Sequence, residues 1–191
     1  TLIIIVVAVI IGCALWLKGA YNNMVTAEEG VSAAWSQVEN VYQRRSDLIP
    51  NLVATVKGYA EHESSTLESV IAARARAAQI TVSPDNLDEA SIAEYGKAQG
   101  ELTSALGRLM AVAESYPDLK ANSVFSELQA QLEGTENRIA TERMKFNEAA
   151  RTYNTMIRKF PDNILASMLG FERKGYFEAQ DGADKAPVVA F

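Results

Sequence analysis

His62 is the only histidine in this sequence, and Glu63 follows it directly. This pair matches the start of the zinc-protease helix motif His-Glu-x-x-His, in which both histidines bind the metal and the glutamate acts as a general base. The motif requires its second histidine four residues after the first, where this chain has Thr66. The sequence therefore lacks that zinc site, and we expect no bound metal.

Other catalytic patterns also lack a required residue or its context. A di-metal helical bundle takes Glu-x-x-His pairs from two helices, which a single histidine does not supply. No glycine-rich loop follows a predicted strand, as a phosphate site requires, and no serine lies in the pattern of a nucleophile elbow. A serine acting with His62 and a carboxylate stays formally possible. We expect a noncatalytic protein without catalytic residues, cofactor or metal.

Four charged residues stand where the hydrophobic periodicity predicts the interior of a helical protein. They are Glu28, Arg45, Glu63 and Glu142, with Arg44 and Arg138 near the edge of the same rows. Because a buried carboxylate without a partner is costly, we expect these interior side chains to pair with one another. Two interpretations stay open: the pairs fix the register of the helices, or they form a polar seam that a partner helix uses.

The elements that position these residues begin with an apolar segment. Residues 2–17 contain no charge, and a helix that continues a few residues further reaches about 30 Å, the thickness of a bilayer core. Trp16, Lys18 and Tyr21 follow, and such aromatic and basic residues collect at the level of the lipid headgroups. We predict a transmembrane anchor over residues 1–20 that contacts membrane lipid and has its interface at these three side chains.

Two other interpretations of this segment stay open. Residues 12–14 could form the cleavage site of a secretory signal, and residues 10–13 (IIGC) resemble a lipobox whose cysteine carries lipid. The apolar run continues through Leu17, where a lipoprotein turns polar, so we expect a retained anchor. Cys13 is the only cysteine in the sequence, which leaves no second thiol for an intrachain disulfide.

After the anchor, large apolar residues recur in alternating steps of three and four, which is typical of helices that pack at shallow angles. Prolines interrupt these rows and are expected to separate four helices. The predicted helices run from the anchor to a turn at residues 46–50, from 51 to about 79, from an N-cap at Ser83 to 116, and from about 125 to 160. The predicted fold class is all-α, with a single N-terminal transmembrane helix continuous with an elongated antiparallel four-helix bundle.

This periodicity divides the chain into an anchor over residues 1–20, an elongated helical bundle over 21–170 and an extended C-terminal tail over 171–191. Val189 and Phe191 alternate along the tail and could dock in a groove or on a sheet edge. A loosely ordered terminus is the alternative.

Composition limits the classes of function. Hydrophobic residues make up 48% of the chain and charged residues 22%, which is typical of a folded domain. The net charge is −6, and because nucleic-acid binding requires a basic face, we expect no nucleic acid as a partner.

Motifs spread in order over nearly the whole chain resemble those of the LemA family. They are residues 21–25 (YNNMV), 34–38 (AWSQV), 44–53 (RRSDLIPNLV), 56–60 (VKGYA), 62–63 (HE), 116–122 (YPDLKAN), 135–140 (TENRIA), 153–154 (YN), 160–161 (FP) and 185–191 (KAPVVAF). The resemblance implies an N-terminal anchor, a long antiparallel helical bundle in a bacterial membrane and no established enzymatic activity. It also implies a connection to membrane-protein quality control, through neighbouring membrane metalloprotease genes. Met24 departs from the family, in which leucine is commoner, and the chain begins at Thr1 without an initiator methionine.

Two functions follow from these patterns. The first is a membrane-anchored helical scaffold that associates into a homo-oligomer. The second is an adaptor that recruits a membrane metalloprotease or another envelope enzyme. We expect a single-pass protein of the bacterial inner membrane, and we expect basic residues before Thr1, which would place the bundle outside the cytoplasm.

Overall fold

The computed structural model describes residues 2–60 and 62–178, and within these residues it contains helices and no strands. The predicted all-α fold class is therefore confirmed. The described helices are α1 (Leu2–Lys57), α2 (Ser64–Gln79), α3 (Glu89–Ala113), α4 (Pro117–Lys120), α5 (Ser123–Met156) and α6 (Asp162–Leu169).

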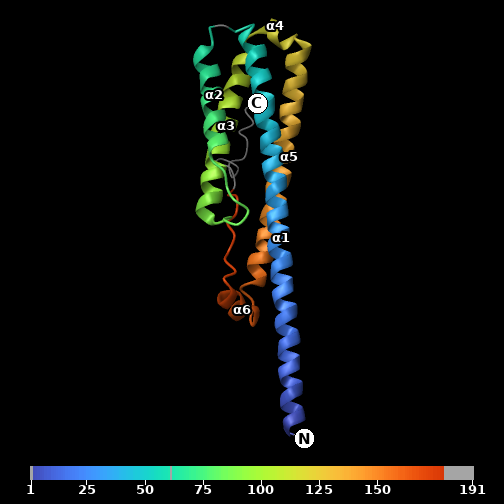
Figure 1. Cartoon of the computed structure of the whole chain (residues 1–191). Helices are drawn as coiled ribbons and strands as arrows, with labels where there is room; N and C mark the ends of the chain where they lie inside the picture. Colours follow the sequence, from blue (N-terminus) through green and yellow to red (C-terminus); the bar gives the residue numbers. More distant parts are fainter. Residues whose placement is uncertain (1, 61, 179–191) are drawn as a thin grey trace, which may run out of the picture.

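The four longer helices form an elongated antiparallel arrangement (Figure 1). α5 packs along α1, and α2 and α3 form an antiparallel hairpin beside this pair. The short helix α6 lies next to α1 at the other end of the bundle from α4. The first part of α1, residues 2–19, is exposed on all sides and extends beyond the bundle; we call it the stem.

α1 passes from the stem into the bundle without a break. It has 56 residues, or about 84 Å at 1.5 Å per residue. Its first buried residue is Ala20, and from Met24 onward buried residues follow the predicted three-four rhythm. The continuity of the apolar segment with the first bundle helix is thus as predicted.

The turn predicted at residues 46–50 is absent, because Pro50 lies inside α1 and the helix continues to Lys57. A proline leaves the carbonyl four residues earlier without its helical donor. Here the Arg74 guanidinium of α2 donates to that carbonyl, Ser46 O, at 3.0 Å. Burial of Ile49 and Leu52 on either side of the proline favours the helix as well. The contact between α2 and α1 therefore outweighs the tendency of proline to end a helix.

The other helix ends differ from prediction for local reasons. α3 starts at Glu89 and not near Ser83, because Asp88 caps it and accepts a hydrogen bond from Ser91 N at 2.7 Å. The preceding residues form a connection that buries Val82 and Leu87. The predicted fourth helix, residues 125–160, corresponds to α5, which ends at Met156.

Two hydrophobic clusters follow one another along the bundle. The cluster nearer to α4 contains Ile49 of α1, Leu102 of α3 and Leu132 of α5 among its buried residues. The cluster nearer to the stem contains aromatic side chains that meet at Trp35, with ring centroids 5.1 Å from Tyr95 and 5.5 Å from Phe146. Such edge-to-face contacts favour one arrangement of the rings.

Candidate functional site

Arg45 lies between the two hydrophobic clusters and is only 1% exposed. Its polar partners come from two other helices, and two of them, on α3 and α5, lie in sequence between a residue of one cluster and a residue of the other. These partners, which with Arg45 we call the Arg45 cluster, are Gln99 and Thr103 of α3 and Glu136 of α5. The arrangement is a polar layer that joins α1, α3 and α5 at one height.

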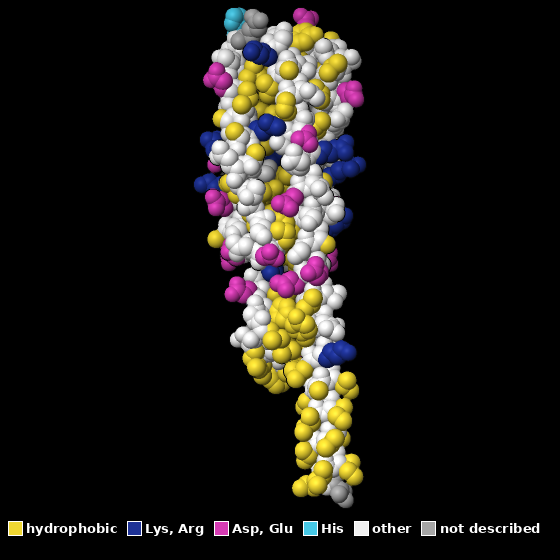
Figure 2. Space-filling model, in the orientation of Figure 1, with side chains coloured by type: hydrophobic (Ala, Val, Ile, Leu, Met, Phe, Trp, Pro, Cys, Tyr) yellow, Lys and Arg dark blue, Asp and Glu magenta, His cyan; other side chains and the backbone are white. Residues whose placement is uncertain are grey.

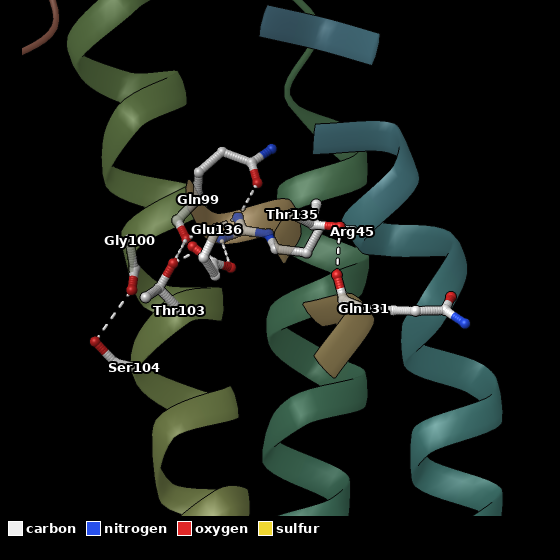
Figure 3. A network of polar contacts seen from close by, with 8 residues as sticks. All are labelled: Arg45, Gln99, Gly100, Thr103, Ser104, Gln131, Thr135 and Glu136. Carbon is white, nitrogen blue, oxygen red and sulfur yellow. Dashed lines mark hydrogen bonds and ion pairs between the residues drawn. The ribbon is translucent and has the colours of Figure 1, made fainter. Parts of the chain in front are cut away.

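The contacts of this layer are short (Figure 3). Arg45 Nη1 donates to Thr103 Oγ1 at 2.6 Å and to Glu136 Oε1 at 3.0 Å, and Arg45 Nη2 donates to the Gln99 carbonyl oxygen at 3.1 Å. The Gln99 side-chain oxygen accepts a further bond from Nη2. The guanidinium carbon also lies 4.9 Å from the centre of the Tyr42 ring. Its charge is therefore balanced by one carboxylate and several dipoles.

The structure does not join the four predicted interior residues into one network. Glu28, Glu63 and Glu142 are half-buried, and each has its own partner at a different height. Glu28 pairs with Lys174 at 2.7 Å, Glu63 accepts from Tyr116 Oη at 3.1 Å, and Glu142 pairs with Lys145 at 2.8 Å. Arg44 and Arg138, predicted near the edge of the rows, are exposed.

The predicted interface residues lie where the stem meets the bundle. Trp16 and Lys18 are exposed on the stem, and the ring of Tyr21 meets the ring of Phe171 edge to face, with centroids 6.0 Å apart. Among the described helices, α1 is the one whose length and composition would allow it to cross a membrane, and no side chain in its most apolar stretch is buried.

Residues 171–178, which we call the C-terminal strap, bind along α5 through two asparagines. Asn154 donates to the Lys174 carbonyl at 2.8 Å and accepts from the Lys174 amide at 2.9 Å. Asn147 makes the same pair of bonds with Phe177, at 2.8 and 2.9 Å. Seven helical residues and three extended residues both span about 10 Å. The two asparagine side chains of α5 therefore form hydrogen bonds with the backbone of the strap, as the backbone of a neighbouring β-strand would.

The rest of the strap fills the space between α5 and the α2–α3 hairpin. The Phe177 ring stacks on Trp35 with centroids 5.9 Å apart, and Lys174, 8% exposed, points its ammonium at Glu28. A β-carbon on Gly175 would lie 2.7 Å from Asp88 O, so the backbones approach too closely there for a side chain. The strap thus contacts α5, α1 and the segment that links α2 to α3.

An open groove of about 1010 Å³ lies between α2 and α3 and reaches Phe177 and Glu178 at the end of the described strap. Arg76 and Glu101 form an exposed ion pair in it at 3.3 Å. Among residues 2–60 and 62–178, no group of three or more His, Cys, Asp or Glu side chains is placed to hold a metal ion. His62 is exposed.

Tyrosines near these contacts are held protonated. Burial raises the pKa of Tyr42, Tyr95 and Tyr153, and for Tyr153 the neighbouring Glu28 carboxylate acts in the same direction. Their phenols are therefore neutral at physiological pH and are not available as bases. In this region the described side chains hold the helices and the strap together.

Sequence periodicity located Arg45 but missed its partners and the strap contacts. Gln99, Glu136, Asn147 and Asn154 lie at or beside the apolar rows, but nothing in their spacing indicates which distant atom each one meets. Val189 and Phe191, the predicted docking residues of the tail, lie outside the described residues.

Comparison with known proteins gives consistent matches. A model of the LemA family matches residues 34–191. Magnetosome proteins MamQ 2 and MamQ 1 of Paramagnetospirillum magneticum are each 33% identical to the chain over 186 residues, which cover 88% of this chain and 68% of each relative. Protein LemA of Metamycoplasma hominis is 24% identical over 163 residues, covering 85% of this chain and 71% of that protein.

Proposed function

Because the chain belongs to the LemA family, we propose that it is a noncatalytic, membrane-anchored helical scaffold that assembles with further copies of itself at the bacterial inner membrane. The observation that carries this proposal is the stem. Twelve large apolar side chains between Leu2 and Leu17 are exposed, and at about 1.5 kcal/mol each their contact with water would cost on the order of 20 kcal/mol. That exceeds the stability of a typical domain, so the stem needs a lipid environment.

The way α1 is built supports self-association. One uninterrupted helix contributes to both stem and bundle, so neighbouring copies anchored in one bilayer would stand parallel. Confinement in the plane of the membrane raises their effective concentration, and long parallel bundles can then pair along their sides.

The mass of the native particle tests the scaffold. We expect the full chain, extracted in a mild detergent and measured by light scattering, to form a particle many times the 20.8 kDa of one chain. The same measurement in lipid nanodiscs controls for detergent effects. A single chain per particle under both conditions would contradict self-association.

The side of the membrane is tested with a single introduced thiol. Cys13 lies in the stem, so a Cys13→Ala background leaves a bundle cysteine from Met144→Cys as the reporter, because Met144 is exposed on α5. We propose that the bundle lies outside the cytoplasm. A membrane-impermeant maleimide should then label spheroplasts of this variant; labelling only after lysis would place the bundle inside.

The groove between α2 and α3 favours a second candidate, an adaptor for a membrane metalloprotease or another envelope enzyme. It is open and is lined mainly by α2 and α3, with Arg143 contributed by α5. A β-carbon on Gly100 meets nothing within 4 Å, so Gly100→Leu would fill the groove with little effect on the fold. If the groove binds the enzyme, crosslinking to it should fall for this variant and not for Gly30→Leu, a matched change at an open position on α1. Equal crosslinking would reject the groove.

A further inference from the structure

The short helix α6 is fixed at the level where the stem leaves the bundle. Its Ala166 is buried and its Leu165 is half-buried against the cluster nearer to the stem. Phe171, just after α6, contacts Tyr21 of α1 at a ring distance of 6.0 Å. α6 therefore sits at the height of the aromatic and basic residues that end the apolar segment of α1.

An apolar surface formed by α6 and by Phe160, which precedes the helix, is uncovered. We call it the basal patch and define it as Phe160, Ile164, Met168 and Leu169, which are 81%, 54%, 78% and 50% exposed. Figure 2 shows apolar side chains gathered at this end of the bundle, beside the point where the apolar stem emerges. An apolar surface that large side chains form together marks a place where another surface binds.

The charges around the patch suit an anionic lipid surface. Exposed Lys18, Arg158, Lys159 and Arg173 lie in the segments that border the patch, where the acidic residues are Asp162 and Glu172. The local balance is thus positive, although the whole chain carries a net charge of −6. Basic residues beside apolar ones are typical of helices that lie in the headgroup region.

We propose that the basal patch inserts into the headgroup region of the same bilayer that holds the stem, so that each chain touches the membrane twice. This inference rests on the proposed membrane anchoring of α1. Because the patch and the stem belong to one packed unit, contact at two points sets the tilt of the bundle and its rotation about the stem, which one helix alone would leave free. The patch is thus a second membrane contact that orients the elongated bundle.

Quenching of tryptophan fluorescence by brominated lipids tests both contacts separately. The full chain is reconstituted in vesicles of phosphatidylcholine and phosphatidylglycerol with bromine near the glycerol end of the acyl chains. In the native chain Trp16 reports on the stem, while Trp35 is fully buried in the bundle. For the patch, Met168→Trp is placed in a Trp16→Phe background. The matched control is Met144→Trp in the same background, since Met144 is also an exposed methionine, 66% accessible, on α5.

In brominated vesicles we expect the emission that position 168 adds to that of Trp35 to fall at least twofold in the Met168→Trp variant, and we expect no loss beyond that of Trp35 from the Met144→Trp variant. Quenching of Trp16 together with an unquenched Met168→Trp variant would overturn the inference and leave the anchor intact. A blue-shifted but unquenched signal would assign the patch to a second protein copy, and that result also overturns it. An unquenched Trp16 would refute the proposed anchoring itself. Helical content by circular dichroism confirms that each variant is folded.

Discussion

A buried guanidinium is costly unless its charge is matched, and Arg45 shows how this chain matches it. Glu136 supplies the opposite charge, while Gln99 and Thr103 accept hydrogen bonds from the two terminal nitrogens; the buried Nε has no hydrogen-bond partner among the described residues. A polar layer between two apolar clusters penalises any shift of one helix along another, because such a shift would bury the charge without its partners. At the residue scale, we therefore propose that the layer fixes the register of the helices.

The two sides of this ion pair should differ in their contribution to stability. Glu136→Ala leaves a buried cation without its counterion, so we expect a loss of about 2–3 kcal/mol, less than the roughly 3–5 kcal/mol of a fully buried pair because Glu136 is 32% exposed. Arg45→Met removes the charge and keeps an apolar chain, and it should cost about 1 kcal/mol. Chemical unfolding followed by circular dichroism measures both values. Arg138→Met, at an exposed position on α5, is the control; equal and negligible effects of Glu136→Ala and Arg45→Met would show that the pair is solvated.

The tyrosines predict how stability depends on pH. Burial raises the pKa of Tyr95 and Tyr153 in the folded chain, so the folded state holds these protons more tightly than the unfolded state does. Stability should therefore be complete below the unfolded-state pKa of about 10 and fall as the pH rises above it. Thermal unfolding midpoints between pH 8 and 11.5 measure the decline, which Tyr153→Phe should reduce.

Single residues also mark the limit of prediction from sequence. Arg45 was recognisable because a charge interrupts an apolar row. Glu136 was not, because it stands beside Thr135, which occupies the row and is buried. Asn147 and Asn154 look like ordinary surface residues until the strap is placed against them. Periodicity reports which face of a helix is inside, and it contains no information on which distant atom a polar side chain will meet.

At the scale of elements, the rows predicted four helices of the bundle and the fading of helix near Gly170, where φ is +76°. The break that the proline predicts at Pro50 is absent, because α1 continues through this residue. The compensating donor, Arg74, comes from another helix. A break inferred from proline is therefore reliable only where no side chain can satisfy the carbonyl that the proline leaves open.

Pro50 provides a direct test of this explanation. It is exposed, so Pro50→Ala loses little buried surface, restores a backbone donor for Ser46 O and removes a ring that strains the helix. We expect stabilisation by about 1–2 kcal/mol, less than the full ~3 kcal/mol of an interior proline, because Arg74 already meets the carbonyl. Pro117→Ala is the control, since a proline in the first turn of α4 costs nothing there. Destabilisation by Pro50→Ala would contradict this explanation.

At the scale of the whole molecule, the stem and the bundle share one helix, and this makes the protein a rod rather than a domain on a tether. From Tyr21 to Lys57, α1 would rise about 55 Å above the membrane surface. Single-particle images of the full chain in nanodiscs should show the bundle at that height with little scatter in its tilt. Inserting Gly-Ser-Gly after Gly19 breaks the continuity of the helix just before its first buried residue, Ala20, and should widen the distribution of tilt while the bundle keeps its shape. If the native chain scatters as widely as this variant, the bundle moves independently of its anchor and α1 does not transmit orientation.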